Sequence, residues 1–498
     1  MSKTRRLVRR MGMTPQSHND RSRRLALYVL CTGMLMIVLD VTIVNVALPS
    51  IQDDLGFTSS SLAWVVNAYL IAFGGLLLLA GRLGDLIGRR TVFLAGLALF
   101  TVASLVCGSA QSQEMLVGAR FVQGIGGAMT SAVILGMIVT MFPEPRLQAR
   151  AIGVYAFVAS AGGSVGLLAG GVLTESINWH WIFFVNVPIG IATGVAAVHL
   201  IAPDKGLGLD HGADVPGALI ITSSLMLGVY TIVEPAAVDG WGSTGALTLG
   251  ATSLALLAAF VAWESRARTP LIPLRIFRSR SISGANAIQA LSVAGMFGVF
   301  FLGSLYLERV LGYSPLQIGL AFLPVTVVMG TLSVRCSEPL VMRFGARNTV
   351  LAGMTLIAAA LCLFATSPVD GSFLRDVLPA MLLLGAGAGV AFPALMNLAM
   401  SGVRPEEAGL ASGLVNTSAQ VGGALGLAVL ATLSSARSDA LRDGGASAAS
   451  ALTSGYHLAY LIGAALVLAA IAVGLTVVSS DRPTGERAGA EPAVAEAA

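Results

Sequence analysis

The chain has 498 residues, of which 55% are hydrophobic and only 11% are charged. Soluble globular domains carry about 25% charged residues, so this composition excludes an ordinary soluble protein. The apolar residues would fill roughly fourteen membrane spans of about 20 residues each. The net charge of +4 is too small to indicate a partner such as nucleic acid.

In chain order, runs of about 20 apolar residues predict fourteen transmembrane helices, and therefore an all-α integral membrane protein. The predicted spans are 27–50, 62–81, 91–109, 115–141, 151–173, 181–202, 215–233, 245–263, 284–307, 315–334, 349–366, 377–400, 409–433 and 456–478.

The positions of Lys and Arg indicate how these spans are oriented. With a cytoplasmic N-terminus, 25 of the 30 basic residues fall in the two tails and in the connections on the cytoplasmic side, and four fall in connections on the other side. Cytoplasmic connections of membrane proteins are enriched in Lys and Arg. The sequence therefore predicts an even number of spans with both termini in the cytoplasm.

Two polar joins divide the spans into groups of six, two and six. The predicted units are a basic N-terminal tail (1–26), a six-helix bundle (27–202), a two-helix insert with its joins (203–283), a second six-helix bundle (284–478) and a disordered C-terminal tail (479–498). The segment 434–455 is rich in Ala, Ser and Gly, which predicts a low-complexity loop between the last two spans.

Two charged residues lie well inside predicted spans, Asp40 in the first and Arg120 in the fourth. A charge in the hydrocarbon is costly, so such residues are expected to serve a transport or proton pathway. Burial favours a protonated carboxylic acid, whereas a nearby guanidinium favours the carboxylate, so an acid between these influences can take up and release a proton. The alternative is a fixed buried pair that only holds two helices together.

The fifth predicted span carries glycines at helical spacing, which let helix backbones approach closely. These residues are Gly153, Gly162, Gly166, Gly170 and Gly171. Their two interpretations are static packing and a surface that slides during alternating access. The sequence has no G-x-x-x-x-G-K-[ST] phosphate loop, which disfavours ATP-driven transport by this chain.

Other polar and aromatic side chains inside the spans are candidates for lining a substrate cavity, with helix packing as the alternative role. They are Asn45, Trp64, Asn67, Tyr69, Gln123, Asn286, Gln289, Asn397, Asn416 and Gln420. The four cysteines lie far apart in apolar stretches, and no Ser/His/Asp or paired-carboxylate constellation is present. We therefore predict a protein that is not an enzyme, with no catalytic residues and no metal.

Several motifs resemble those of the fourteen-span drug/proton antiporter branch of the major facilitator superfamily, the EmrB/QacA-like multidrug efflux transporters. The motifs are LDVTIVNVALP (39–49), GRLGDLIGRR (81–90), ARFVQGIGGA (119–128), WHWIFFVNVPIG (179–190), GYSPLQIGLAFLP (312–324) and GLASGLVNTSAQVGGALG (409–426). The similarity extends over residues 27–479, which is nearly the whole predicted membrane domain.

The resemblance implies the major facilitator fold and proton-driven export of a hydrophobic compound. It assigns proton coupling to Asp40 and makes Arg120 its modulator. It also implies that Asp85 lies against the N-terminus of a helix in the other bundle and that Arg89 pairs with Glu144. The conformational latch implied in this way consists of Gly81, Asp85, Gly88, Arg89, Arg90 and Glu144.

Two positions depart from the family pattern. Leu167 follows Gly166 where the antiporter motif of the fifth helix has a proline. Leu86 follows Asp85 where a basic residue is frequent. These residues predict a fifth helix without the antiporter kink and a weaker latch.

Asp40 is the only deep carboxylate, so we expect a small amphipathic substrate that is neutral or carries one charge. We expect the proton gradient to supply the energy without a cofactor, in a monomer embedded in the bilayer of the bacterial cytoplasmic membrane. Two alternatives stay open: a transporter of a defined metabolite, such as a lipid, siderophore or amino acid, and a scaffold or sensor that does not transport.

Overall fold

The computed structural model describes residues 15–58, 60–142, 144–204, 206–208, 212–400 and 408–477. The helices of this part of the chain are long, and thirteen of them are apolar enough to span a membrane. The remaining predicted span falls in α6 (Pro145–Ser176), whose segment Val165–Ser176 also qualifies as a shorter apolar helix. The described residues thus confirm the predicted all-α architecture.

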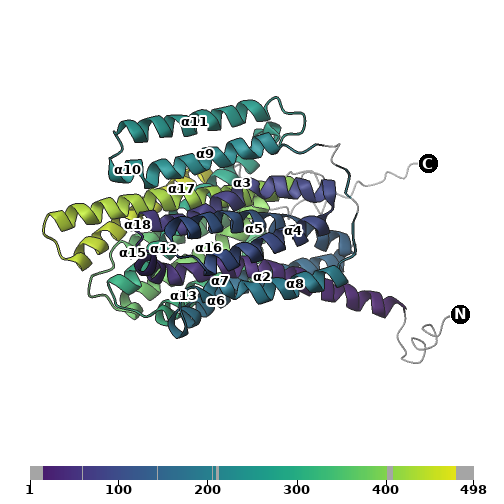
Figure 1. The fold of residues 1–498 in the computed structure, drawn as a ribbon, viewed down its shortest axis with the longest axis horizontal. Coiled ribbons are helices and arrows are strands. Elements are labelled where there is room, and N and C mark those ends of the chain that lie inside the picture. The colour runs from purple at the N-terminus through teal and green to yellow at the C-terminus, as the bar shows by residue number, and fades with distance from the viewer. Residues whose placement is uncertain are drawn as a thin grey trace, which may run out of the picture.

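The helices form two bundles and an insert (Figure 1). The N-bundle comprises α2 (Pro15–Leu55), α3 (Trp64–Ile87), α4 (Arg89–Gly108), α5 (Gln113–Met141), α6, and the pair α7 (Trp181–Phe184) and α8 (Asn186–Leu200). The C-bundle comprises α12 (Arg280–Arg309), α13 (Pro315–Arg335), α14 (Ser337–Phe344), α15 (Ala346–Phe364), α16 (Leu378–Met400), α17 (Ala408–Asp443) and α18 (Ala448–Thr476).

The insert lies outside the two bundles and consists of α9 (Val215–Val233), the short α10 (Pro235–Val238) and α11 (Thr244–Glu264). The Ser224 and Ser253 hydroxyls each donate to the other residue's carbonyl oxygen at 2.8 Å, which fastens α9 to α11. Helix α9 also packs against α3 and α17, whereas α11 is the outermost helix in Figure 1. The insert therefore contacts both bundles mainly through α9, with a smaller contact of α10 on α17.

Helix ends follow local sequence signals. Ser112, Asp214, Ser243, Ser279, Ser314 and Ser447 each accept a hydrogen bond from a backbone N–H in the first turn of the helix that follows. Such side chains satisfy N–H groups that have no partner within the helix. Gly88 and Gly345 turn the chain sharply between consecutive helices with φ of 99° and 82°, a conformation that glycine adopts without strain.

Two sequence expectations differ from the structure. Helix α2 begins at Pro15, so the second half of the predicted tail continues the first span. The loop predicted at 434–455 is wrong, because α17 runs to Asp443 and α18 begins at Ala448. Alanine is the strongest helix former, and Gly455 lets α18 approach the Ser434 carbonyl of α17, so this segment is a helical hairpin.

The two bundles repeat the same packing register. In the N-bundle, Cβ atoms added at Gly166 and Gly170 of α6 would lie 2.9 and 2.8 Å from the carbonyls of Leu39 and Ile43 in α2. In the C-bundle, Gly422 and Gly426 of α17 meet Ala290 and Ala294 of α12 in the same way. The helix pairs α4 with α5 and α15 with α16 also cross at glycines, namely Gly96, Gly126, Gly353 and Gly387.

Candidate functional site

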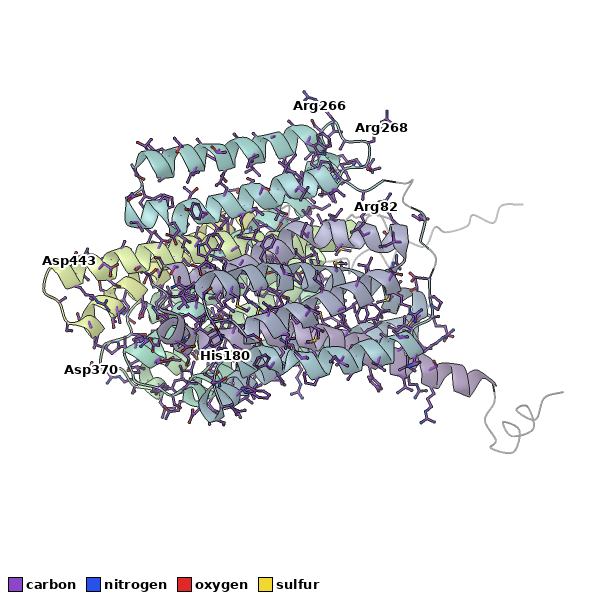
Figure 2. All side chains as sticks on the ribbon, in the orientation of Figure 1. Arg82, His180, Arg266, Arg268, Asp370 and Asp443 are labelled. Carbon is purple, nitrogen blue, oxygen red and sulfur yellow. The ribbon has the colours of Figure 1, made fainter. Side chains whose placement is uncertain are left out.

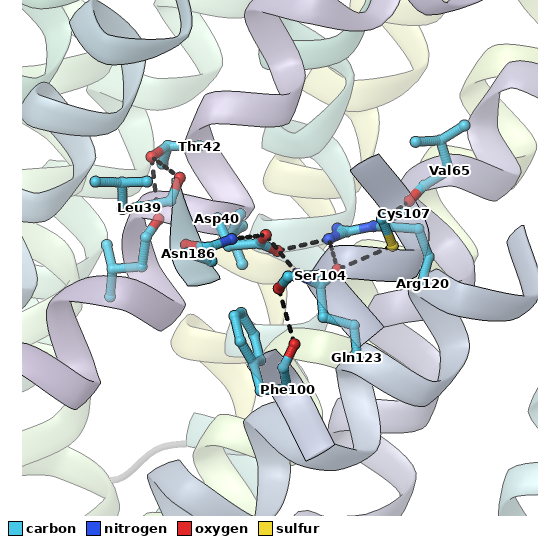
Figure 3. A network of polar contacts seen from close by, with 12 residues as sticks. Leu39, Asp40, Thr42, Val65, Phe100, Ser104, Cys107, Arg120, Gln123 and Asn186 are labelled. Carbon is cyan, nitrogen blue, oxygen red and sulfur yellow. Dashed lines mark hydrogen bonds and ion pairs between the residues drawn. The ribbon is translucent and has the colours of Figure 1, made fainter. Parts of the chain in front are cut away.

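The centre of the N-bundle holds a buried ion pair between Asp40 of α2 and Arg120 of α5 (Figure 3). The Arg120 Nη1 lies 2.5 Å from the Asp40 Oδ2, and both side chains are at most 1% exposed. Arg120 also donates from Nε to the Val65 carbonyl of α3 at 2.9 Å. The structure thus brings together the two charges singled out from the sequence.

Two amide side chains complete the coordination of the Asp40 carboxylate. Gln123 donates from Nε2 to Asp40 Oδ1 at 2.7 Å, and Asn186 of α8 donates to the same oxygen at 3.0 Å. Gln123 also donates to the Ser104 hydroxyl of α4 at 2.8 Å and accepts from Arg120 at 2.6 Å. The network therefore joins α2, α3, α4, α5 and α8, so a change at Asp40 alters hydrogen bonds that connect five helices.

Aromatic rings enclose the Arg120 guanidinium. Its carbon lies 4.5 Å from the centroid of the Tyr69 ring and 5.7 Å from that of Phe183, distances that allow cation–π attraction. The Tyr69 hydroxyl of this cage, the Asn186 Oδ1 and, elsewhere on α3, both amide atoms of Asn67 are buried without a hydrogen-bond partner among the described residues. These four polar atoms can bind a proton carrier, a water or a substrate group without breaking an existing bond.

The other cavity candidates lie outside this network. Asn45 donates to Val41 of its own helix, and Asn286 accepts from the Ser418 hydroxyl of α17 at 2.8 Å. Asn397, three residues before the end of α16, and Asn416 of α17 are exposed, and Gln289 is half-buried. Gln420 of α17 packs on Gly74 of α3, so it lies between the bundles.

Trp64 also lies away from the network. The residue is 8% exposed and lines a cavity between the N-bundle and the insert.

Ser104 is a member of the network that the sequence did not predict. A serine that also donates to the Phe100 carbonyl of its own helix leaves no charge or periodicity signal in the sequence.

The GRLGDLIGRR motif forms the turn between α3 and α4. Arg89 donates to the Asp85 carboxylate at 3.0 Å and to the Gly136 carbonyl of α5 at 2.9 Å. The expected pairing of Arg89 with Glu144 is wrong, because these two partners engage the guanidinium while Glu144 is exposed at the start of α6. Arg90 donates to the Val198 carbonyl near the end of α8 at 2.7 Å.

The Asp204 carboxylate occupies a helix N-terminus at this turn, while the contact of Asp85 with a helix of the other bundle stays a prediction. The Asp204 oxygens accept from the backbone N–H groups of Arg89 and Arg90 at 2.6 and 3.0 Å, which places an anion at the start of α4. The N–H of Leu207 also donates to the Asp85 carbonyl at 2.9 Å. The join to the insert is therefore docked on the latch motif.

Small residues make this docking possible. A Cβ at Gly88 would lie 2.8 Å from the Asp204 carbonyl, and one at Gly206 would lie 2.1 Å from the Leu86 carbonyl. Gly81 is less crowded, with the Ala132 side chain 3.9 Å from its Cβ position. Glycine is therefore required at positions 88 and 206, where the join touches the turn.

At the end of the molecule away from the α3–α4 turn, the two bundles contact each other. Arg309 of α12 forms an ion pair with Asp53 of α2. Glu175 of α6 accepts from the Ser314 hydroxyl at 2.7 Å and from the Leu316 N–H at 3.0 Å. Gly171 lets α6 contact Leu316 at the same place. The N-terminus of α13 thus binds a carboxylate of the other bundle.

The glycines of α6 serve two different contacts. Gly162, Gly166 and Gly170 pack on α2, whereas Gly171 packs on α13 of the C-bundle. The packing of Gly153 lies outside the described side chains. Leu167, which replaces the antiporter proline, is fully buried, and its carbonyl faces Gly319 of α13.

Two pseudo-equivalent bundles of membrane-spanning helices around a buried charge network define a multi-pass transporter. The sequence profile of the Major Facilitator Superfamily matches residues 30–427, and the chain belongs to this family. The fold resembles a bacterial homologue of the human lysosomal transporter Spinster, solved in an inward-facing, unoccupied conformation, with a TM-score of 0.66 and 17% identity over 92% of this chain and 97% of that one.

Curated relatives cover nearly the full length of the chain. It is 37% identical over 461 residues to the puromycin resistance protein pur8 of Streptomyces alboniger, covering 91% of both chains. It is 38% identical over 471 residues to the cephamycin export protein CmcT of Amycolatopsis lactamdurans, covering 94% of both chains.

Proposed function

We propose that this protein exports hydrophobic antibiotics or drugs across the bacterial cytoplasmic membrane in exchange for protons. The observation that carries the proposal is the Asp40 carboxylate, buried in the N-bundle and bonded to Arg120, Gln123 and Asn186. The two antibiotic resistance and export relatives support the substrate class. The proton gradient supplies the energy, and no cofactor takes part.

Asp40 is the proton-coupling residue in this proposal. A proton on Asp40 removes the charge that holds Arg120, so the guanidinium is free to turn to other partners, among them the Tyr69 ring that already faces it. Because Asp40 is fully buried, a proton reaches it only when the helices around it separate. Loading and release of the proton are thereby tied to a change in the N-bundle.

The two ends of the molecule alternate in opening. The Arg309 pair with Asp53 and the Glu175 contact with α13 close one end. The turn with Asp85, Arg89 and Asp204 is at the other end and acts as the latch. We place the exposed amides of Asn397 and Asn416 on the substrate path, because polar side chains in membrane-spanning helices usually face a polar cavity rather than lipid.

The orientation follows from the distribution of charge. Figure 2 shows Arg82, Arg266 and Arg268 at one end of the molecule and Asp370 and Asp443 at the other. We assign the end rich in arginine to the cytoplasm. The unit is a monomer, and its substrate is a small amphipathic molecule that is neutral or carries one charge.

A resistance assay tests the proposal. An efflux-deficient bacterium expressing the wild-type protein should resist some members of an antibiotic panel, and dye efflux should collapse with a protonophore. Asp40→Asn should abolish both effects while the variant stays folded in the membrane. Asp443→Asn, at an exposed carboxylate of the C-bundle, is the matched control and should keep wild-type efflux. Wild-type efflux in Asp40→Asn would refute the coupling role.

A further inference from the structure

A cavity of about 740 Å³ lies between the N-bundle and the insert, away from the Asp40 network. Its walls come from α3 and α5 on one side and from α9 and α11 on the other, with Trp64, Phe121, Met226 and Leu256 among its lining residues. This volume lies within the usual range of small-molecule sites, about 300 to 1,000 Å³.

The cavity exists because α9 is anchored elsewhere. Thr222 of α9 packs so closely on Gly75 of α3 that a Cβ there would lie 2.5 Å from the Thr222 hydroxyl. Near its other end, α9 receives a hydrogen bond at 3.3 Å from Thr432 of α17 to the Ile232 carbonyl. These two attachments hold α9 beside α3 and α17 and leave space next to α5.

The lining combines aromatic rings with negative charge. Phe57, Trp64, Phe121 and Tyr230 contribute the rings. Glu114 at the start of α5 and Glu234 at the end of α9 are the charged members, and the described lining contains no Lys or Arg. Neither carboxylate forms an ion pair within the described residues. Aromatic faces together with carboxylates attract organic cations.

The rest of the lining is uncharged and mostly apolar, with Leu219, Met226 and Leu227 along α9. Ser61, Gln113, Thr222 and Ser223 are its polar members. The Thr222 hydroxyl is buried against Gly75 of α3, so it belongs to the contact that fastens α9 and is not open to a bound molecule.

We propose that this cavity binds an amphipathic organic cation, whose charge lies near Glu114 and Glu234 and whose apolar body lies along α9. Two carboxylates without a basic neighbour repel the phosphate of a phospholipid, which argues against a lipid headgroup as the occupant. The site is distinct from the Asp40 network and does not depend on proton coupling.

The test uses purified full-length protein and two probes of nearly equal shape and opposite charge, tetraphenylphosphonium and tetraphenylborate. Equilibrium dialysis measures their binding. The variant Glu114→Gln/Glu234→Gln removes both charges that face the cation and should weaken phosphonium binding by about threefold to tenfold. Leu256→Trp, which fills the cavity, should weaken it at least about tenfold.

Matched controls separate this site from any other. Leu254→Trp changes an outward-facing residue two positions away on α11, and Asp443→Asn removes a carboxylate far from the cavity; both should bind like the wild type. Asp40→Asn should also keep phosphonium binding, so loss of transport and loss of this site are distinguishable. Unchanged binding in Leu256→Trp, or equally tight binding of tetraphenylborate at the same place, would overturn the proposal.

Discussion

The two bundles pack alike but hold different residues at their centres. Gly166 contacts Leu39 in the N-bundle as Gly422 contacts Ala290 in the C-bundle, so Leu39 and Ala290 occupy equivalent positions. Asp40, which follows Leu39, is therefore equivalent to Leu291. Gly126 contacts Gly96 as Gly387 contacts Gly353, so Gly126 and Gly387 are also equivalent. Arg120 and Met381 each lie six residues before these glycines and are therefore equivalent. By the same count Gln123 matches Leu384, which is fully buried.

This difference distinguishes packing from function. The C-bundle brings its helices equally close with apolar residues where the N-bundle has the ion pair and the Gln123 amide. Apolar residues can replace a buried ion pair at little cost or with a gain in stability. The Asp40 network is therefore not needed to hold the helices together, which favours a role in transport over a purely structural one.

The largest expected effect comes from exchanging one partner for its C-bundle counterpart. Arg120→Met leaves Asp40 buried without its cation, and we expect a loss of about 3 to 5 kcal/mol in unfolding free energy. The double variant Asp40→Leu/Arg120→Met should recover the stability of the wild type but carry no proton-driven efflux. Thermal unfolding in detergent and dye efflux measure the two effects.

The double variant decides between the two roles of the pair. If it unfolds as easily as Arg120→Met, the network is structural and the bundles are not equivalent. If it is stable and still exports the dye with protonophore sensitivity, another group couples the proton.

A smaller effect on stability is expected at the glycine contacts that the two bundles share. Gly166→Ala would place a Cβ 2.0 Å from the Thr42 hydroxyl, and Gly422→Ala would place one 2.3 Å from the Ala290 carbonyl. Overpacking of this kind costs about 1 to 3 kcal/mol, and we expect similar losses in both bundles. Unfolding temperatures of the two variants check this, with Gly118→Ala, which meets nothing within 4 Å, as the control. A large loss in one bundle alone would show that their packing is not equivalent.

The smallest effect concerns the docked join. Asp204→Ala removes the anion at the start of α4, and the loss of such a cap costs about 0.5 to 2 kcal/mol. We expect slower efflux with unchanged substrate binding, measured by initial rates against substrate concentration. Asp239→Ala, in the turn after α10, is the comparison variant. An efflux rate equal to that of the wild type would exclude the join from the latch.

Charge and hydropathy were sufficient to predict the membrane spans and to single out Asp40 and Arg120. A charge in lipid is costly enough to mark its position in the sequence by itself. Asp204 could not be recognised in this way, because an acid in a polar join has no energetic signature until the fold brings it to α4. Alanine and serine in 434–455 were read as a loop from composition, although alanine strongly favours a helix.

The docked join has a consequence for how motion of this transporter can be observed. Asp204, Leu207 and the Arg82 bond to the Gly212 carbonyl fix both sides of the join to α3 and α4. We infer that the insert moves with the N-bundle, so that its contact with α17 is the one that changes when the two bundles move relative to each other. A fluorophore on the outward face of α11 would move with the N-bundle. A second fluorophore on α18 would report the distance between the two bundles, and neither label would disturb the Asp40 network.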